Sequence, residues 1–134
     1  YSLTNVMIGK NDPNVMAILD WELSTLGDPC ADFNYHCLQY TMNPKLADKE
    51  YCKNQGIPVI DDYVKMYSEK IEIDLTEEWD LYSAYNLFKL AGILQGILGR
   101  VRDGTAAHEN AAERASGVRN LSDKAWDLVE KNFL

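Results

Sequence analysis

An amide and a carboxylate near the start of the chain have the residue types and the spacing to bind a metal ion. Asn5 precedes one short apolar run, and Asp20 follows another. If Gly9 pairs with Met16 in an antiparallel hairpin, Asn5 falls opposite Asp20, and residues paired in this way lie roughly 4.5–5.5 Å apart at Cα. Two hard oxygen donors at one point suit Mg²⁺, which takes few protein ligands and completes its shell with water and phosphate oxygens. On spacing alone, ordinary turn or cap residues are the simpler interpretation.

The elements that must position this pair are two β-prone runs, at 6–8 and 15–19, and the loop between them, which is rich in Gly, Asn, Asp and Pro. Such a pattern predicts a β-hairpin. Because the strands are antiparallel, the start of the first and the end of the second lie at the same edge. The sequence therefore predicts that Asn5 and Asp20 share the open end of the hairpin.

A helix is predicted directly after the hairpin. Asp28 has the preference of an N-cap and Pro29 that of the first helical position, so a helix should begin there and run to about residue 40. Asp32 lies in its first turn, where the helix dipole favours a carboxylate. Residues at spacings of three and four form one apolar stripe on this helix, namely Cys30, Phe33, Cys37 and Tyr40.

Four further helical regions follow, at about 44–53, 61–71, 79–102 and 106–133. We expect Thr76 to cap the third of these and Gly117 to break the last. From residue 87 onward the third has apolar residues on almost every face, which predicts a buried central helix. Its glycines predict a close crossing with a neighbouring helix, and they are Gly92, Gly96 and Gly99.

The first 32 residues resemble the aminoglycoside-phosphotransferase family of kinase-like enzymes. The matching segments are Asn5-Val6-Met7-Ile8, Ile18-Leu19-Asp20-Trp21-Glu22, Gly27-Asp28-Pro29 and Asp32. The resemblance implies that Asn5 is the catalytic-loop Asn and Asp20 the metal-binding Asp, and that both hold Mg²⁺ on the phosphates of ATP. It also implies that Asp32 is a structural residue that tethers the catalytic loop.

The resemblance extends over nearly the whole chain and points to one branch of the family. Residues 23–27 and 88–96 are similar to the kinase-like domains found with acyl-CoA dehydrogenases. The implied fold is α+β and mostly α, with a short N-terminal β-hairpin followed by the helical C-terminal lobe of a protein-kinase-like fold. Residues 1–134 would form a single domain, with the hairpin and metal site in 1–27 and the helical part in 28–134.

The catalytic base is not expected within this chain. The family's catalytic Asp would lie five residues before Asn5, which is one residue before Tyr1. The N-terminal lobe, with its phosphate-contacting Lys and its adenine-binding segment, would precede that position. We therefore name no catalytic residue and expect this chain alone to be inactive.

Composition narrows the class of partner. The chain has 134 residues, 46% hydrophobic and 25% charged, which is typical of a soluble globular domain. Its net charge of −8 argues against binding to nucleic acid or to an anionic membrane surface. Three cysteines and the lack of a signal peptide at the start favour a reducing, cytoplasmic location.

Two other chemistries find little support. Cys30, His36, Cys37 and Cys52 lack the tight paired spacing of a structural zinc site, so buried free cysteines are the favoured interpretation. A Ser-His-Asp site would need a nucleophile motif that the sequence lacks. His108, near a helix start, is expected to be a surface or capping residue.

Two hypotheses of function remain. The first is the C-terminal part of an ATP- and Mg²⁺-dependent phosphotransferase that acts on a hydroxyl of a small molecule, which the branch suggests is a hydroxylated acyl or acyl-CoA compound. The second is a non-catalytic kinase-like helical module that acts by self-association or partner binding. The surface that would meet a missing lobe should be partly apolar, which leaves homodimerisation open.

Overall fold

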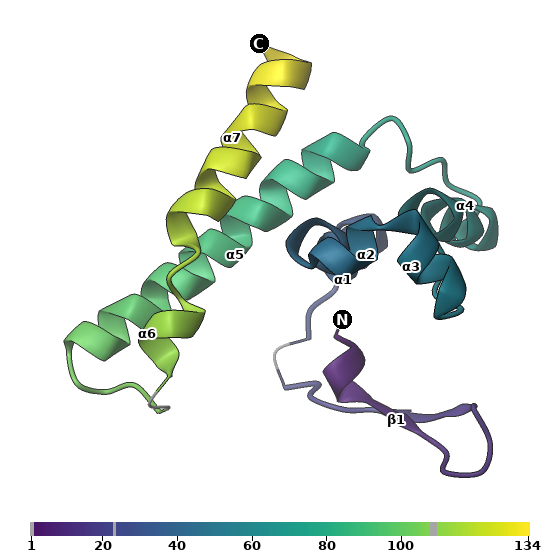
Figure 1. Ribbon diagram of the computed structural model, residues 1–134, viewed down its shortest axis with the longest axis horizontal. Helices are drawn as coiled ribbons and strands as arrows, with labels where there is room; N and C mark the ends of the chain where they lie inside the picture. The colour runs from purple at the N-terminus through teal and green to yellow at the C-terminus, as the bar shows by residue number, and fades with distance from the viewer. Residues whose placement is uncertain (1, 23, 108–109) are drawn as a thin grey trace.

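The computed structural model describes residues 2–22, 24–107 and 110–134. It is mostly helical, with one short hairpin near the N-terminus, so the predicted α+β, mostly α architecture is confirmed. Figure 1 shows the hairpin on one side of the helical part, with α7 lying along α5. In chain order the elements are η1 (Leu3–Asn5), β1 (Val6–Ile8), β2 (Val15–Ile18), α1 (Pro29–Met42), α2 (Pro44–Ala47), α3 (Lys49–Asn54), α4 (Ile60–Ile71), α5 (Trp79–Arg102), α6 (Ala111–Arg114) and α7 (Val118–Phe133).

The hairpin pairs β1 with β2 in antiparallel order, but its register differs from the predicted one. Val6 lies opposite Ile18 and Met7 opposite Ala17, and an irregularity then brings Ile8 opposite Val15. The predicted Gly9–Met16 pairing is therefore wrong by about one residue. The loop explains the difference, because the Gly9 N–H donates to the Asn14 carbonyl (3.1 Å) and closes the turn earlier than expected.

Gly9 is required at this turn by the close approach of the backbone. A Cβ at this position would lie 2.7 Å from the carbonyl oxygen of Asp12, closer than side chains tolerate. Asp12 in turn accepts hydrogen bonds from the backbone and side-chain nitrogens of Asn14. The loop is thus held by its own polar residues.

Helix α1 begins as predicted. The Asp28 side chain accepts a hydrogen bond from the Cys30 N–H (2.8 Å), and Pro29 occupies the first helical position. The predicted stripe faces inward: Cys30, Phe33 and Cys37 are buried, and Tyr40 packs at the edge of the same core.

Two apolar cores lie against α1. The first joins α1 to α4 and to the start of α5, and its Phe33 ring stacks on Tyr67 with centroids 3.8 Å apart. The second joins α1, α5 and α7 through Leu38, Leu87 and Leu121. Helix α1 therefore fixes the positions of the other long helices.

A buried polar network also locks α1 to α5. The Asn86 side-chain nitrogen donates to the Ala31 carbonyl (2.8 Å) and to Oδ1 of Asn34 (3.0 Å). Asn34 donates from its own nitrogen to the Ser83 hydroxyl (2.9 Å). Both asparagines are 1% exposed, so these bonds replace water that the side chains have lost.

Helix α5 is not buried on all sides, contrary to prediction. Its inward face carries Ala84, Leu87 and Ala91, whereas Phe88 and Ile93 are exposed. The three helix glycines make no close crossing: among the described residues, a Cβ at Gly92 or Gly99 would meet nothing within 4 Å, and one at Gly96 only a guanidinium nitrogen of Arg100.

Several helix ends also differ from the sequence pattern. Thr76 does not cap α5, because it bonds to Asp74, and Glu78 precedes the helix without a side-chain cap. The predicted helix at 44–53 is divided at Asp48, which caps α3. Gly117 does divide the last region into α6 and α7, as predicted. His108 lies outside the described residues.

Within the part of the chain that the structure describes, none of the helices combines the length and the apolar character needed to cross a membrane.

Candidate functional site

The structure brings Asn5 and Asp20 into direct contact. The Asn5 side-chain nitrogen donates to Oδ2 of Asp20 at 2.9 Å. The two residues are not directly opposed, because the Asn5 carbonyl accepts from the N–H of Leu19 (2.8 Å). The sequence correctly predicted that these two side chains lie together, but it predicted the wrong strand register for the hairpin.

The backbone of Asp20 makes the contact. Asp20 has φ of 67°, in the left-handed region, which Asp tolerates better than most residues. The chain leaves the strand at this point, so a turn returns the carboxylate toward Asn5. After it, the Trp21 indole nitrogen donates to the Ile18 carbonyl (2.6 Å), which ties the exit segment to the end of β2.

A short helical turn holds the other half of the pair. Asn5 is the last residue of η1, and Ser2 caps the start of this turn. The Ser2 hydroxyl accepts a hydrogen bond from the Thr4 N–H (3.4 Å) and lies 2.8 Å from the Thr4 hydroxyl. Asn5 is half-buried and Asp20 exposed. The pair is thus a supported amide beside a carboxylate that solvent and ligands can reach.

The donor set fits Mg²⁺ as a partial site. An amide oxygen and a carboxylate are hard ligands of the kind Mg²⁺ takes, and this ion commonly uses one or two carboxylates together with phosphate oxygens and water. Among the described residues, no group of three His, Cys, Asp or Glu side chains could hold a metal alone. Asn5 and Asp20 would therefore hold the ion only together with a phosphorylated ligand.

Asp32 lies exposed in the first turn of α1, where its N–H donates to the Asp28 carbonyl (3.3 Å). This position satisfies the dipole argument that predicted an acid there. The tethering role that the family resemblance implies for Asp32 stays a prediction.

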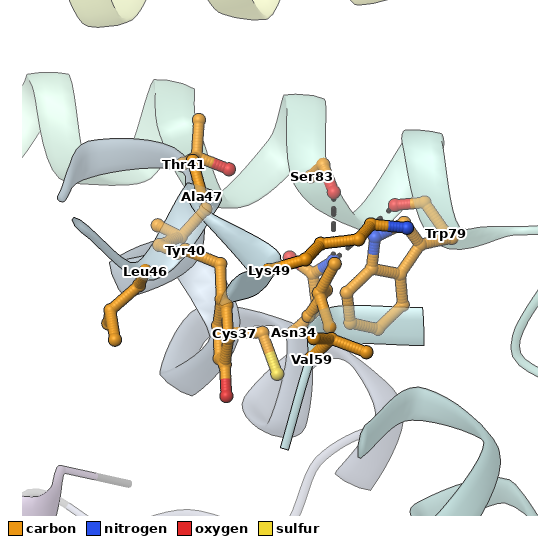
Figure 2. Close-up of a pocket in the computed structure, with 12 residues that line it drawn as sticks. Asn34, Cys37, Tyr40, Thr41, Leu46, Ala47, Lys49, Val59, Trp79 and Ser83 are labelled. Atoms are coloured by element: carbon orange, nitrogen blue, oxygen red, sulfur yellow. Dashed lines mark hydrogen bonds between the residues drawn. The ribbon is translucent and has the colours of Figure 1, made fainter. Parts of the chain in front are cut away.

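A cavity of about 290 Å³ lies where α1, the short helices and the start of α5 meet (Figure 2). Its polar groups already have partners: Asn34 bonds to Ser83 and to the Trp79 carbonyl, and Lys49 pairs with Asp61 at 2.9 Å. We assign no ligand to this cavity, because no buried side-chain nitrogen or oxygen among the described residues lacks a hydrogen-bond partner.

The cysteines behave as the sequence suggested. Cys30, Cys37 and Cys52 are buried and unpaired. Burial raises the pKa of the Cys37 thiol to about 12, so it stays protonated and unreactive. His36 lies 3.2 Å from the Tyr63 hydroxyl, and burial lowers the pKa of its ring. Cys30, Cys37 and His36 belong to the aromatic core between α1 and α4, whereas the Cys52 thiol of α3 donates to the Leu46 carbonyl.

A model of the phosphotransferase enzyme family matches residues 1–85. The chain belongs to this family. The matched stretch contains both Asn5 and Asp20, together with α1 to α4 and the start of α5. Membership in the phosphotransferase family therefore confirms the resemblance drawn from the first 32 residues.

Curated relatives of this phosphotransferase-family chain carry acyl-CoA dehydrogenase names. Acyl-CoA dehydrogenase family member 10 of Mus musculus is 34% identical over 98% of this chain and 13% of its own length. Family member 11 of Homo sapiens is 30% identical over 99% of this chain and 18% of its own length. The probable acyl-CoA dehydrogenase IBR3 of Arabidopsis thaliana is 32% identical over 97% and 16%. The chain thus spans less than a fifth of these relatives, and the predicted branch is confirmed.

No solved structure matches the chain.

Sequence reasoning missed the polar residues that join α1 to α5. Asn34 and Asn86 were not singled out, because a polar residue on a helix looks like an exposed one until its neighbours are known. Tyr82 was also missed, although its hydroxyl lies 2.7 Å from Oδ2 of Asp28. The one available signal for Asn86 is its place between apolar residues of α5.

Proposed function

We propose that this chain supplies the Mg²⁺-binding edge of a kinase-like phosphotransferase that moves the terminal phosphoryl group of ATP to a hydroxyl of a small molecule. The single observation that carries the proposal is the contact between Asn5 and Asp20 at the end of the hairpin. Membership in the phosphotransferase enzyme family supports it.

The roles of the two residues follow from their chemistry. In kinase-type transfer, bound Mg²⁺ neutralises charge on the phosphates, and most of catalysis is positioning. Asp20 would bind the ion through its carboxylate, and Asn5 would bind it through its amide oxygen. The bond between them orients the carboxylate before any ligand arrives, which lowers the cost of ordering the site.

The hairpin supports the view that further residues complete the site. Its side chains are apolar on both faces and largely exposed, including Met7, Ile8, Val15 and Met16. Exposed apolar patches of this kind mark contact surfaces. The catalytic base and the adenine site would come from such a contacting part of a longer protein, since the relatives are more than five times as long as their matched segments.

The acceptor that we favour is a hydroxylated acyl or acyl-CoA compound. The relatives support this choice through the name that they share, acyl-CoA dehydrogenase family member. If a phosphotransferase is joined to such an enzyme, we expect the two to act on related acyl substrates.

A change of metal preference tests the ligand role of Asp20. In the longest natural polypeptide that carries this sequence, Asp20→Cys should lose Mg²⁺-supported phosphoryl transfer and regain part of it with Cd²⁺, because a thiolate prefers softer ions. The native cysteines are buried, so they should not compete for the added metal.

The control is Asp123→Cys, which replaces an exposed carboxylate of α7, away from the hairpin. This variant should keep Mg²⁺-supported activity and show no gain with Cd²⁺. Normal Mg²⁺-supported activity in the Asp20→Cys protein would show that Asp20 is not a metal ligand.

A further inference from the structure

The exposed face of α5 carries a continuous stripe that no described element covers. Residues three and four apart share a helix face, and the stripe runs through such steps. Its N-terminal half consists of large side chains, and its C-terminal half consists of glycines. In order the members are Leu81, Tyr85, Phe88, Gly92, Gly96 and Gly99, and all except the half-buried Gly99 are exposed.

We propose that this stripe is a self-docking surface, through which a second copy of the chain packs its α5 antiparallel to the first. Helix α5 has 24 residues, about 36 Å of length. When two such helices are antiparallel and centred between Phe88 and Gly92, each bulky residue meets a glycine of the other copy. Leu81 then lies opposite Gly99 and Phe88 opposite Gly92, and Tyr85 lies within one residue of Gly96.

The shape of the stripe favours this arrangement over other occupants. A two-fold contact requires that the surface be complementary to itself. A stripe with large side chains at one end and glycines at the other has this property only when the two copies of α5 are antiparallel. Among the described residues, a Cβ at Gly92 or Gly99 would meet nothing within 4 Å, so the chain's own packing does not explain these glycines. Each is about 1 kcal/mol worse than Ala in a helix.

The charges at the two ends of α5 are also complementary. Glu77, Glu78 and Asp80 lie at its start. At its end Arg100 and Arg102 outnumber Asp103. Antiparallel docking brings the acidic start of each helix to the basic end of the other and also opposes the two helix dipoles favourably. An anionic membrane surface would repel the acidic start of α5, whereas an antiparallel second copy presents its basic end there.

This inference does not depend on the proposed function, since it concerns α5 and not the hairpin. It gives the chain an interface of the helix-to-helix type, in which aromatic anchors Tyr85 and Phe88 fill positions left open by glycine.

Sedimentation of the 134-residue chain over a wide concentration range is the first test. The wild type should reach twice the 15.2 kDa mass of one chain. Gly92→Leu fills the central hole and should weaken the dimer about tenfold or more, while its better helix propensity keeps the monomer folded. Asn120→Leu, which adds the same side chain at an exposed position of α7, should leave the dimer unchanged.

Exposed apolar residues of the hairpin need their own control. Met16 and Phe88 are both 68% exposed, so Met16→Asp and Phe88→Asp are matched variants. Phe88→Asp should give a monomer and Met16→Asp should not. A wild type that stays monomeric, or a dimer lost with Met16→Asp and kept with Phe88→Asp, would overturn the proposal.

Crosslinking tests the antiparallel direction. Within one helix, positions 81 and 99 are about 27 Å apart, too far for a disulfide. Leu81→Cys/Gly99→Cys should therefore form a covalent dimer on mild oxidation, whereas either single variant should not. Failure of the double variant to crosslink, or crosslinking of the Leu81→Cys variant alone, would contradict the geometry.

Discussion

Tyr82 links the starts of α1 and α5 at the scale of single residues. Its hydroxyl lies 2.7 Å from Oδ2 of Asp28 and 3.0 Å from Oε2 of Glu78, so one proton is shared between two carboxylates. The hydrogen bond from Tyr82 is the main reason that the pKa of Asp28 is held below its ordinary value of 3.8. The same contact raises the pKa of the Tyr82 hydroxyl.

The depressed pKa of Asp28 predicts a pH-dependent contribution to stability. A carboxyl group whose pKa is lower when folded stabilises the fold fully above its unfolded pKa, and this stabilisation is lost as the pH falls through the folded pKa. Tyr82→Phe should therefore have a lower unfolding free energy than wild type at about pH 6. The difference between the two proteins should become smaller as the pH drops to below 3. Because Asp28 is exposed, the effect should stay below about 1 kcal/mol.

Urea unfolding of both proteins across this pH range measures the difference. Tyr85→Phe, which removes a hydroxyl from an exposed ring on the same helix, is the control and should run parallel to wild type. A deficit in Tyr82→Phe that is constant with pH would show that Tyr82 does not act through Asp28.

Asn86 carries a second prediction at this scale. Asn86→Ala leaves Asn34 Oδ1 without its donor in a buried site and removes the bond to the Ala31 carbonyl, which should cost about 2–3 kcal/mol of unfolding free energy. Asn120→Ala, at an exposed position of α7, should change stability by less than about 0.5 kcal/mol. Equal effects of the two variants on the unfolding free energy in urea would show that the buried network does not stabilise the fold.

Asp20 shows why the site was only partly predictable from sequence. The hairpin pattern placed Asn5 and Asp20 at one edge, and the family resemblance singled them out as a metal-binding pair. The contact, however, forms in a register one residue away from the expected one, and Asp20 has a left-handed backbone. Neither has a pattern signal, because non-glycine residues enter this region only where the surrounding chain requires it.

At the scale of elements, helices were predicted best where a cap and a stripe agreed. Helix α1 begins at the predicted Asp28-Pro29, and α5 spans the predicted 79–102. Burial of α5 was not predictable, because an apolar face looks the same whether the chain itself or another surface covers it. Phe88, 68% exposed, is the clearest example.

The glycines of α5 give a prediction for the helix itself. Gly92→Ala should raise the unfolding free energy by about 0.5–1 kcal/mol, since the added methyl meets nothing within 4 Å among the described residues and glycine is a poor helix former. Measured at low concentration, this effect belongs to the monomer. Gly104→Ala should instead destabilise, because Gly104 has φ of 71°.

Thermal unfolding followed by circular dichroism distinguishes the two variants. We expect the midpoint to rise for Gly92→Ala and to fall for Gly104→Ala. A fall for Gly92→Ala would mean that the position is packed against something that the structure of one chain does not contain.

At the scale of the whole molecule, the two surfaces have separate roles. The hairpin presents Asn5, Asp20 and exposed apolar side chains on one side of α1, and the stripe of α5 lies in the helical part. A phosphotransferase site completed by further chain at the hairpin is compatible with pairing through α5. The two proposals can therefore be tested on separate variants.

Turnover by an Asp20→Ala variant tests the central claim most directly. It should be measured in the longest natural polypeptide that carries this sequence, with ATP and Mg²⁺, beside Asp123→Ala, an exposed carboxylate of α7, as a control. We expect Asp20→Ala to abolish phosphoryl transfer with little loss of folding, and Asp123→Ala to keep phosphoryl transfer. Full turnover in a folded Asp20→Ala protein would contradict the assignment of Asn5 and Asp20 as the metal-binding pair.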